Sequence, residues 1–255
     1  MNVPIDDVQF NVDGIWGPIS RVTRESFDSV PSGTFGHVFS ARYLGDSVAF
    51  KLLPSKPGVR AEAAHEAFMT EAENMLAVRG IIDRARVLQR VGVPLSEPCE
   101  LRDADRRCRE PHDLRGWRHI VNVFGVGSIP DLAAVAPGLP PGPAHFVVME
   151  LLTGGSLGVL PRPADVVARA PLELSSGLAA LAAAHVVHAD VKPENIMLRT
   201  PGGELVLTDF GVGRIARGGV DEATNVTAGP AGGTTAYMAP ELHDGTHAST
   251  FASDM

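Results

Sequence analysis

The stretch HADVKPENIML at residues 188–198 constrains this chain more than any other part of it. It places an acid, a lysine and an amide within six residues, as Asp190, Lys192 and Asn195, and an apolar run follows. An ordinary connection between two elements does not need three such side chains so close together. The segment therefore predicts a loop that carries chemistry, and the rest of the chain decides which chemistry.

Length and composition exclude several classes of protein. At 255 residues the chain can bury a sizeable core, as one large domain or two small lobes. A net charge of −8 disfavours nucleic-acid binding, which needs clustered positive charge. The first ten residues lack the basic flank and apolar run of a signal peptide, and the longest apolar stretch, 178–187, is about half a membrane span. Two cysteines make no disulfide framework, so we expect a cytoplasmic protein without a membrane span.

Strand patterns dominate the first half of the chain. Residues 26–53 are rich in β-branched and aromatic residues, and Gly45-Asp46 predicts a hairpin turn between two strands. The segments HIVNVFGVG (119–127) and HFVVMELL (145–152) predict two more strands, separated by a proline-rich linker.

Two helices are predicted. Residues 60–79 contain residues that favour a helix, and Gly80 is a candidate end. In residues 171–187 the apolar side chains Leu174, Leu178 and Leu181 recur at helical spacing. Residues 81–118 are irregular and charged, and we interpret their second half as an inserted surface loop.

Several motifs could together support phosphoryl transfer, which requires neutralised phosphate oxygens, bound Mg²⁺ and an acceptor for a hydroxyl proton. Gly33 and Gly36 in PSGTFGHV would let backbone N–H groups approach phosphates, although such a loop is by itself most often only a turn. Lys51 follows on the next strand and matters only if a carboxylate fixes it. The following helix offers Glu71, with Glu73 as the less favoured choice.

The later motifs supply the remaining groups. HADVKPEN offers Asp190 as proton acceptor, Lys192 to steady the phosphate and Asn195 to hold metal. TDFG (208–211) offers Asp209 for Mg²⁺, and GTTAYMAPE (233–241) closes a loop of small and polar residues. Five motifs in this order at compatible spacing are too many for coincidence.

From about residue 26 to the last residue, the chain resembles a eukaryotic-type protein kinase. The resemblance implies an α+β, two-lobed, protein-kinase-like fold. Its N-lobe (26–150, with the insert at about 81–118) would be a five-stranded antiparallel sheet with one helix. A mostly helical C-lobe (151–255), incomplete here, would follow, and residues 1–25 would be an N-terminal extension.

The resemblance also implies ATP and Mg²⁺ as cofactors and a protein Ser or Thr hydroxyl as substrate. Lys192 and Thr234 are similar to those of serine/threonine kinases rather than tyrosine kinases. Asp190, Lys192 and Asn195 would be catalytic, and Asn195 and Asp209 would hold the metal. The implied ATP-binding residues are Gly33, Thr34, Phe35, Gly36, Val38, Ala49, Lys51, Glu71, Met149 (the gatekeeper), Glu150, Leu152 (the hinge) and Met197.

Two substitutions depart from the family pattern. Pro31 stands where the first glycine of the loop is expected, which we expect at worst to weaken nucleotide binding. Ala189 replaces the arginine that in this family pairs with a phosphate on the activation loop. We therefore expect that loop phosphorylation does not switch this protein, and that Thr224 and Thr227 are ordinary solvated residues.

The last residues form a third departure. FASDM (251–255) resembles the start of the helix that follows the activation segment, with Asp254 bonded to the backbone of the catalytic loop. The rest of that helix is absent, so we expect either a fragment or a partner that covers the incomplete C-lobe.

Alternative functions stay open from the sequence alone. The departures favour a pseudokinase that binds nucleotide or partners, although Lys51, Asp190, Asn195 and Asp209 are all intact. A small-molecule phosphotransferase is disfavoured by GTTAYMAPE, which resembles a docking loop for a protein substrate. A zinc site is also disfavoured, because its candidate ligands lack the paired short spacings of structural zinc sites. Those candidates are Cys99, Cys108, His112 and His119.

Overall fold

The computed structural model describes residues 19–23, 37–43, 46–54, 74–80, 82–83, 86, 115–135, 142–159, 163–183, 185–209, 214–215, 235–243 and 249–254. The chain divides into two compact units. Unit 1 consists of Met1–Ala72 with Asn122–Leu152, and unit 2 of Glu73–Val121 with Thr153–Met255. The lobe boundaries drawn from the sequence stay a prediction.

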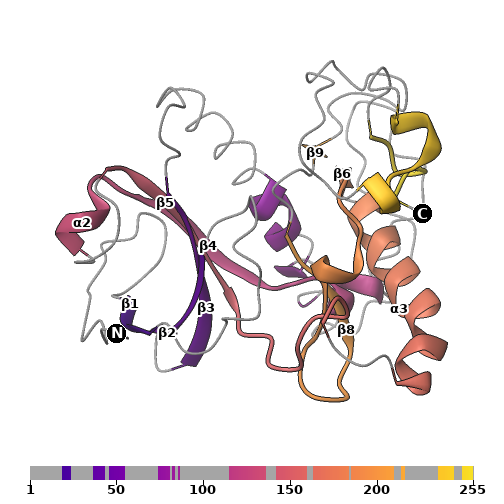
Figure 1. Cartoon of the computed structure of the whole chain (residues 1–255), viewed down its shortest axis with the longest axis horizontal. Helices are drawn as coiled ribbons and strands as arrows, with labels where there is room; N and C mark the ends of the chain where they lie inside the picture. The colour runs from indigo at the N-terminus through magenta and orange to yellow at the C-terminus, as the bar shows by residue number, and fades with distance from the viewer. Residues whose placement is uncertain are drawn as a thin grey trace. The chain divides into compact units, whose positions relative to one another are not determined.

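Unit 1 contains one antiparallel five-stranded sheet (Figure 1). The strands run in the order β1-β2-β3-β5-β4, and every neighbouring pair is antiparallel. Their bounds are β1 Ile19–Thr23, β2 His37–Tyr43, β3 Asp46–Pro54, β4 Val123–Ile129 and β5 Ala144–Glu150. This sheet confirms the predicted α+β fold with a five-stranded antiparallel N-lobe.

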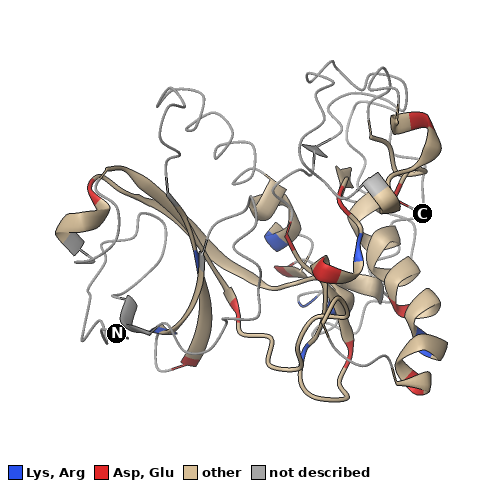
Figure 2. Cartoon of the chain, in the orientation of Figure 1, with Lys and Arg blue, Asp and Glu red and all other residues tan. Residues whose placement is uncertain are grey.

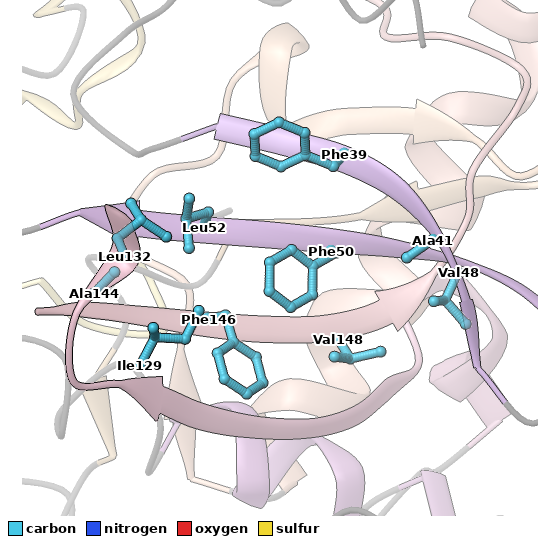
Figure 3. Packing of buried hydrophobic residues seen from close by; sticks show 10 residues of the cluster. All are labelled: Phe39, Ala41, Val48, Phe50, Leu52, Ile129, Leu132, Ala144, Phe146 and Val148. Carbon is cyan, nitrogen blue, oxygen red and sulfur yellow. The ribbon is translucent and has the colours of Figure 1, made fainter. Parts of the chain in front are cut away.

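The core of unit 1 lies on one side of the sheet, as Figure 3 shows. Strand alternation sends every second residue to this side. The rings of Phe50 on β3 and Phe146 on β5 stack there with their centroids 5.0 Å apart. Leu132, from the short helix α2 (Leu132–Val135), is part of the same cluster. Gly127 on β4 gives the Phe146 ring its space, because a Cβ at this position would lie 2.3 Å from Phe146 Cζ.

Unit 2 is built around the helix α3 and short strand pairs. The strand pairs are β6 with β9 and β7 with β8, both antiparallel. Residues 74–80 are helical and bury Met75 and Val78 completely. The other elements of unit 2 are η1 Arg115–His119, α3 Ala164–Ala183, β6 Val186–Val187, η2 Pro193–Asn195, β7 Ile196–Leu198, β8 Leu205–Leu207, β9 Arg214–Ile215, η3 Thr235–Tyr237 and η4 Pro240–Leu242.

Two glycines let η1 pack closely on α3. A Cβ at Gly116 would lie 1.7 Å from the Ser176 carbonyl oxygen, and a Cβ at Gly177 would lie 3.1 Å from the backbone oxygen of His119. By length and composition alone, α3 is the one described helix that could cross a membrane. It buries Val166, Gly177, Ala180 and Leu181 within the chain.

The structure corrects four expectations about the elements. β1 lies within residues 1–25, which we had treated as an extension, because a short edge strand in a polar stretch has little pattern of its own. β3 begins at Asp46, which pairs with Tyr43, so Asp46 is not part of the turn. Helical geometry recurs at residues 82–83, beyond Gly80. α3 begins before residue 171 and runs through Pro171, because a proline removes only one backbone hydrogen bond from this 20-residue helix. It ends at Ala183 rather than at residue 187, because Val186 and Val187 pair with β9 as the strand β6.

Candidate active site

Asp190, Lys192 and Asn195, predicted as the catalytic residues, meet at one oxygen atom. Asn195 Nδ2 donates a hydrogen bond to Asp190 Oδ2 at 2.7 Å and another to the Asp190 carbonyl at 2.8 Å. Lys192 Nζ lies 2.8 Å from the same Asp190 Oδ2. The carboxylate and the ammonium are only 13% and 10% exposed, so little water competes with their attraction. Among the described residues, neither Asp190 Oδ1 nor Asn195 Oδ1 accepts a hydrogen bond.

The hairpin of β7 and β8 connects Asn195 with Asp209. Ile196 pairs with Leu207, so Asn195 immediately before β7 lies opposite Thr208 immediately after β8. Thr208 N–H and Thr208 Oγ1 both donate to the Asn195 carbonyl, at 2.9 and 3.2 Å. Asp209 follows with φ at 64°, a left-handed conformation that turns the chain sharply there. The hairpin thus brings the two predicted metal ligands to the same end of a strand pair.

His188 supports the loop from inside the core. Its side chain is fully buried, its Nε2 lies 2.9 Å from the Thr208 carbonyl oxygen, and the Asp190 N–H donates to its Nδ1 at 3.3 Å. These two bonds together require a neutral ring that carries its proton on Nε2. Burial lowers the pKa of His188 below its ordinary value, against opposing contributions from Asp254 and the Thr208 carbonyl. The ring therefore joins the catalytic loop to the segment that precedes Asp209.

Asp254 anchors the same loop, which confirms the prediction for this residue. Its Oδ2 accepts the His188 N–H at 2.7 Å, and its Oδ1 accepts the Ala189 N–H at 2.9 Å. Thr250 and Ser253 exchange side chain–backbone hydrogen bonds of 2.8 and 3.3 Å just before it, which resembles a helix-capping box. Burial raises the pKa of Asp254, while the two N–H bonds act in the opposite direction.

Ala189 adopts φ of 63°, which is a left-handed conformation. For a residue with a Cβ this region is sparsely populated and costs about 1–2 kcal/mol. The bonds from His188 and Ala189 to Asp254 hold the backbone in this conformation. The strain lies one residue before Asp190, so it sets the direction in which the loop leaves β6.

In unit 1, the predicted nucleotide-binding residues of β2, β3 and β5 share one face of the sheet. Val38 pairs with Lys51, and Ala49 pairs with Met149. Directly paired residues project to the same side, and Ala49 and Lys51 are two residues apart on one strand. All four side chains therefore point away from the phenylalanine core of Figure 3. Lys51 is only 4% exposed, so its charge is withdrawn from water.

The predicted hinge lies at the end of β5. Glu150 and Asn122 exchange two hydrogen bonds: Glu150 N–H donates to the Asn122 carbonyl, and Asn122 N–H donates to Glu150 Oε1, both at 2.9 Å. Leu152, two residues beyond Glu150, is buried. Met197, on β7 in unit 2, is half-buried.

Several predicted residues lie outside the part of the chain that the structure describes. They are Gly33, Thr34, Phe35 and Gly36 of the glycine-rich loop, Glu71, Thr224, Thr227 and Thr234, and the cysteines and His112 of the insert. His119, the one described residue of the suggested zinc set, uses Nδ1 to bond the Leu205 carbonyl oxygen at 2.9 Å.

One further contact with the catalytic loop was not predicted. Ser156 Oγ lies 3.0 Å from the Pro193 carbonyl oxygen and 3.1 Å from that of Glu194, and it accepts the Gly158 N–H at 3.0 Å. This hydroxyl holds η2 from a segment almost forty residues earlier in the chain. A serine in a glycine-rich stretch is common in turns, so no local pattern could have revealed this role.

Comparisons with known proteins point to one family. Residues 140–255 match the family model of the protein kinase domain. The chain is 44% identical over 149 residues to serine/threonine-protein kinase PknK of Mycobacterium tuberculosis (strain ATCC 25618 / H37Rv), covering 56% of this chain and 12% of that protein. It is 41% identical over 106 residues to PknL of the same strain (39% and 25%), and 38% identical over 119 residues to PknA of Mycobacterium bovis (45% and 26%).

The matched segments thus span between about an eighth and a quarter of the length of these relatives. They agree with the geometry of the described residues, in which Asp190, Lys192 and Asn195 converge beside a β7–β8 hairpin that ends at Asp209. Residues 140–255, which contain the catalytic loop and Asp209, are thus similar to the catalytic domain of eukaryotic-type serine/threonine protein kinases.

Proposed function

We propose that this protein transfers the γ-phosphate of ATP to a Ser or Thr hydroxyl of a protein substrate in the cytoplasm. The observation that carries the proposal is the convergence of Lys192 and Asn195 on Asp190 Oδ2. Both donors act on one oxygen, so Asp190 Oδ1 remains to accept the proton of the attacking hydroxyl. Lys192, with its Nζ 2.8 Å from the carboxylate, would steady the transferring phosphoryl group.

The donor set near the catalytic loop suits Mg²⁺, which prefers oxygen ligands. Asn195 donates through Nδ2, so its amide oxygen is the atom left for a cation, and Asp209 adds a carboxylate after β8. Asn195 and Asp209 would hold the ion, which would neutralise charge on the phosphate oxygens. In unit 1, the buried Lys51 would bind phosphate oxygens, and Val38, Ala49 and Met149 on the same face would contact the purine.

Thermal unfolding of the full 255-residue chain tests nucleotide binding. ATP with Mg²⁺ at about a hundred times its Kd should stabilise the protein by about 2.7 kcal/mol, a shift of about 2–4 °C at this size. The shift should require Mg²⁺ and should be lost in Asp209→Asn. A cooperative melt that ATP and Mg²⁺ leave unchanged would contradict the proposed function.

Transfer itself needs a second assay, with γ-labelled ATP and parallel pools of peptides and small hydroxylated metabolites. Label on Ser or Thr peptides alone supports a protein kinase. Binding without transfer would indicate a pseudokinase, and label on metabolites alone would indicate a small-molecule phosphotransferase. Either of these two results would overturn the proposed substrate class.

A further inference from the structure

The outer edge of β8 is capped by side chains from two other elements. In the β7–β8 pair, the Leu205 N–H and C=O point away from β7, since the hydrogen bonds of the ladder fall on the neighbouring residue pair, Arg199 and Glu204. Glu173 Oε2 accepts the Leu205 N–H at 2.8 Å, and His119 Nδ1 bonds the Leu205 carbonyl oxygen at 2.9 Å. The backbone N–H of Leu205 is therefore bonded by a side chain of α3, and its carbonyl oxygen by a side chain of η1.

An ion pair on α3 fixes Glu173 in this position. Arg169 lies one turn earlier, and its guanidinium contacts Glu173 Oε1 at 2.9 Å, which leaves Oε2 for Leu205. The same guanidinium donates to the carbonyl oxygens of Gly202 and Gly203, in the turn between β7 and β8. The Arg169 and Glu173 side chains are 26% and 16% exposed, so water screens their attraction only in part. Figure 2 shows acidic and basic positions along α3.

The strand held in this way leads directly to Asp209, one of the two candidate metal ligands. Leu205–Leu207 is followed directly by Thr208 and Asp209, and Asn195 stands opposite Thr208 across the hairpin. β8 spans only three residues, so a shift at Leu205 is passed to Asp209 with little chance of being absorbed on the way. A further hydrogen bond stabilises the same edge of β8: the Val121 N–H donates to the Leu207 carbonyl oxygen at 3.0 Å.

We propose that Glu173, oriented by Arg169, and His119 are positioning residues that set the placement of Asp209 relative to Asn195 through β8. This inference rests on the proposed function, since it assumes that Asn195 and Asp209 hold Mg²⁺. None of the three side chains is placed to touch nucleotide or protein substrate in this role. They act through the Leu205 backbone and the turn at Gly202 and Gly203.

The test measures the Mg²⁺ concentration that gives half of the ATP-dependent thermal stabilisation of the full chain. Glu173→Ala should raise this concentration by about tenfold, the size typical for outer ligand-orienting partners. Glu173→Gln keeps an oxygen for the Leu205 N–H and should retain most of the wild-type metal dependence. Val166→Ala, a buried position on α3 outside the network, should lower the melting temperature without changing the Mg²⁺ requirement.

The outcomes separate this inference from the proposed function. A wild-type chain without Mg²⁺-dependent stabilisation would overturn both. A wild-type chain with it, together with a Glu173→Ala chain that needs no more Mg²⁺, would overturn the positioning role alone. If Glu173→Ala does not fold, His119→Ala and His119→Asn carry the same test, because the Asn amide can still donate to the Leu205 carbonyl. His119→Ala should raise the Mg²⁺ concentration needed for half of the stabilisation, and His119→Asn should keep it near the wild-type value. The same Mg²⁺ concentration for both variants would overturn the inference.

Discussion

The Asp254 carboxylate bonds the backbone of Ala189, sixty-five residues earlier in the chain, with 2.9 Å between Oδ1 and the amide nitrogen. Its other oxygen accepts the His188 N–H at 2.7 Å. Asp254→Ala would leave two partly buried donors without an acceptor, so we expect the free energy of unfolding to fall by about 2–4 kcal/mol. Asp131→Ala is the control, because Asp131 also accepts two backbone N–H groups but is exposed, where water can replace it. Equal losses in urea unfolding would contradict this account.

The left-handed backbone at Ala189 predicts an unusual order of substitutions. Ala189→Gly should be neutral or stabilising by up to about 1 kcal/mol, since glycine adopts a φ of 63° without strain. Ala189→Val should cost at least about 1 kcal/mol, because a β-branched side chain is most strained in this region. Urea titration of the three proteins provides the comparison, and a valine variant as stable as the glycine variant would refute the strained backbone.

The buried His188 predicts a pH dependence of stability. Its folded pKa lies below the ordinary value of 6.5, so between these two values the unfolded chain binds more protons than the folded chain. Stability should therefore be lost as the pH falls below 6.5, by at most about 1.4 kcal/mol per pH unit. The raised pKa of Asp254 acts with the opposite sign, upward from its ordinary value of 3.8.

A His188→Gln variant isolates the contribution of the imidazole, because it removes the titrating group and keeps a side-chain amide. Its stability between pH 7.5 and the region just below 6.5 should fall less steeply than that of the wild type, in urea unfolding at each pH. Parallel curves for the two proteins would mean that His188 titrates equally in the folded and unfolded chains.

Two glycines in the chain should respond oppositely to alanine. At Gly127 the added Cβ would lie 2.3 Å from Phe146 Cζ and 2.9 Å from Cε1, so we expect a loss of about 1–3 kcal/mol from overpacking. At Gly80, which is helical, a Cβ would meet nothing within 4 Å, so alanine should stabilise by about 0.5–1 kcal/mol through its helix propensity. Thermal melts of both variants would show whether the Phe146 ring can move aside.

Asp190→Asn should separate binding from catalysis. The amide keeps the shape of the side chain but cannot take up the hydroxyl proton, so phosphoryl transfer should fall by about 10²–10⁴-fold. ATP affinity should stay nearly unchanged, as measured by the thermal shift with Mg²⁺. Asp165→Asn, at the exposed start of α3, should alter neither quantity. A comparable loss of binding and transfer in Asp190→Asn would contradict the role assigned to Asp190.

Local spacing made much of the catalytic loop predictable from the sequence. Asp190, Lys192 and Asn195 lie within six residues, so a single turn of the backbone is enough to bring their side chains together. Strand alternation likewise placed Ala49 and Lys51 on one face of β3. β1 was missed because its place in the sheet depends on its pairing with β2 rather than on its own pattern.

The sequence by itself determined the resemblance to protein kinases and the chemical groups, since the identity and order of these groups are local properties of the chain. Only the tertiary structure decided which distant groups hold those residues in place. Glu173 and His119 reach Leu205 from elements that are separate in sequence, and no periodicity links them to β8. The physical reason is that a short strand or loop cannot satisfy its own backbone N–H and C=O groups, and the fold alone determines which partners come within hydrogen-bonding distance.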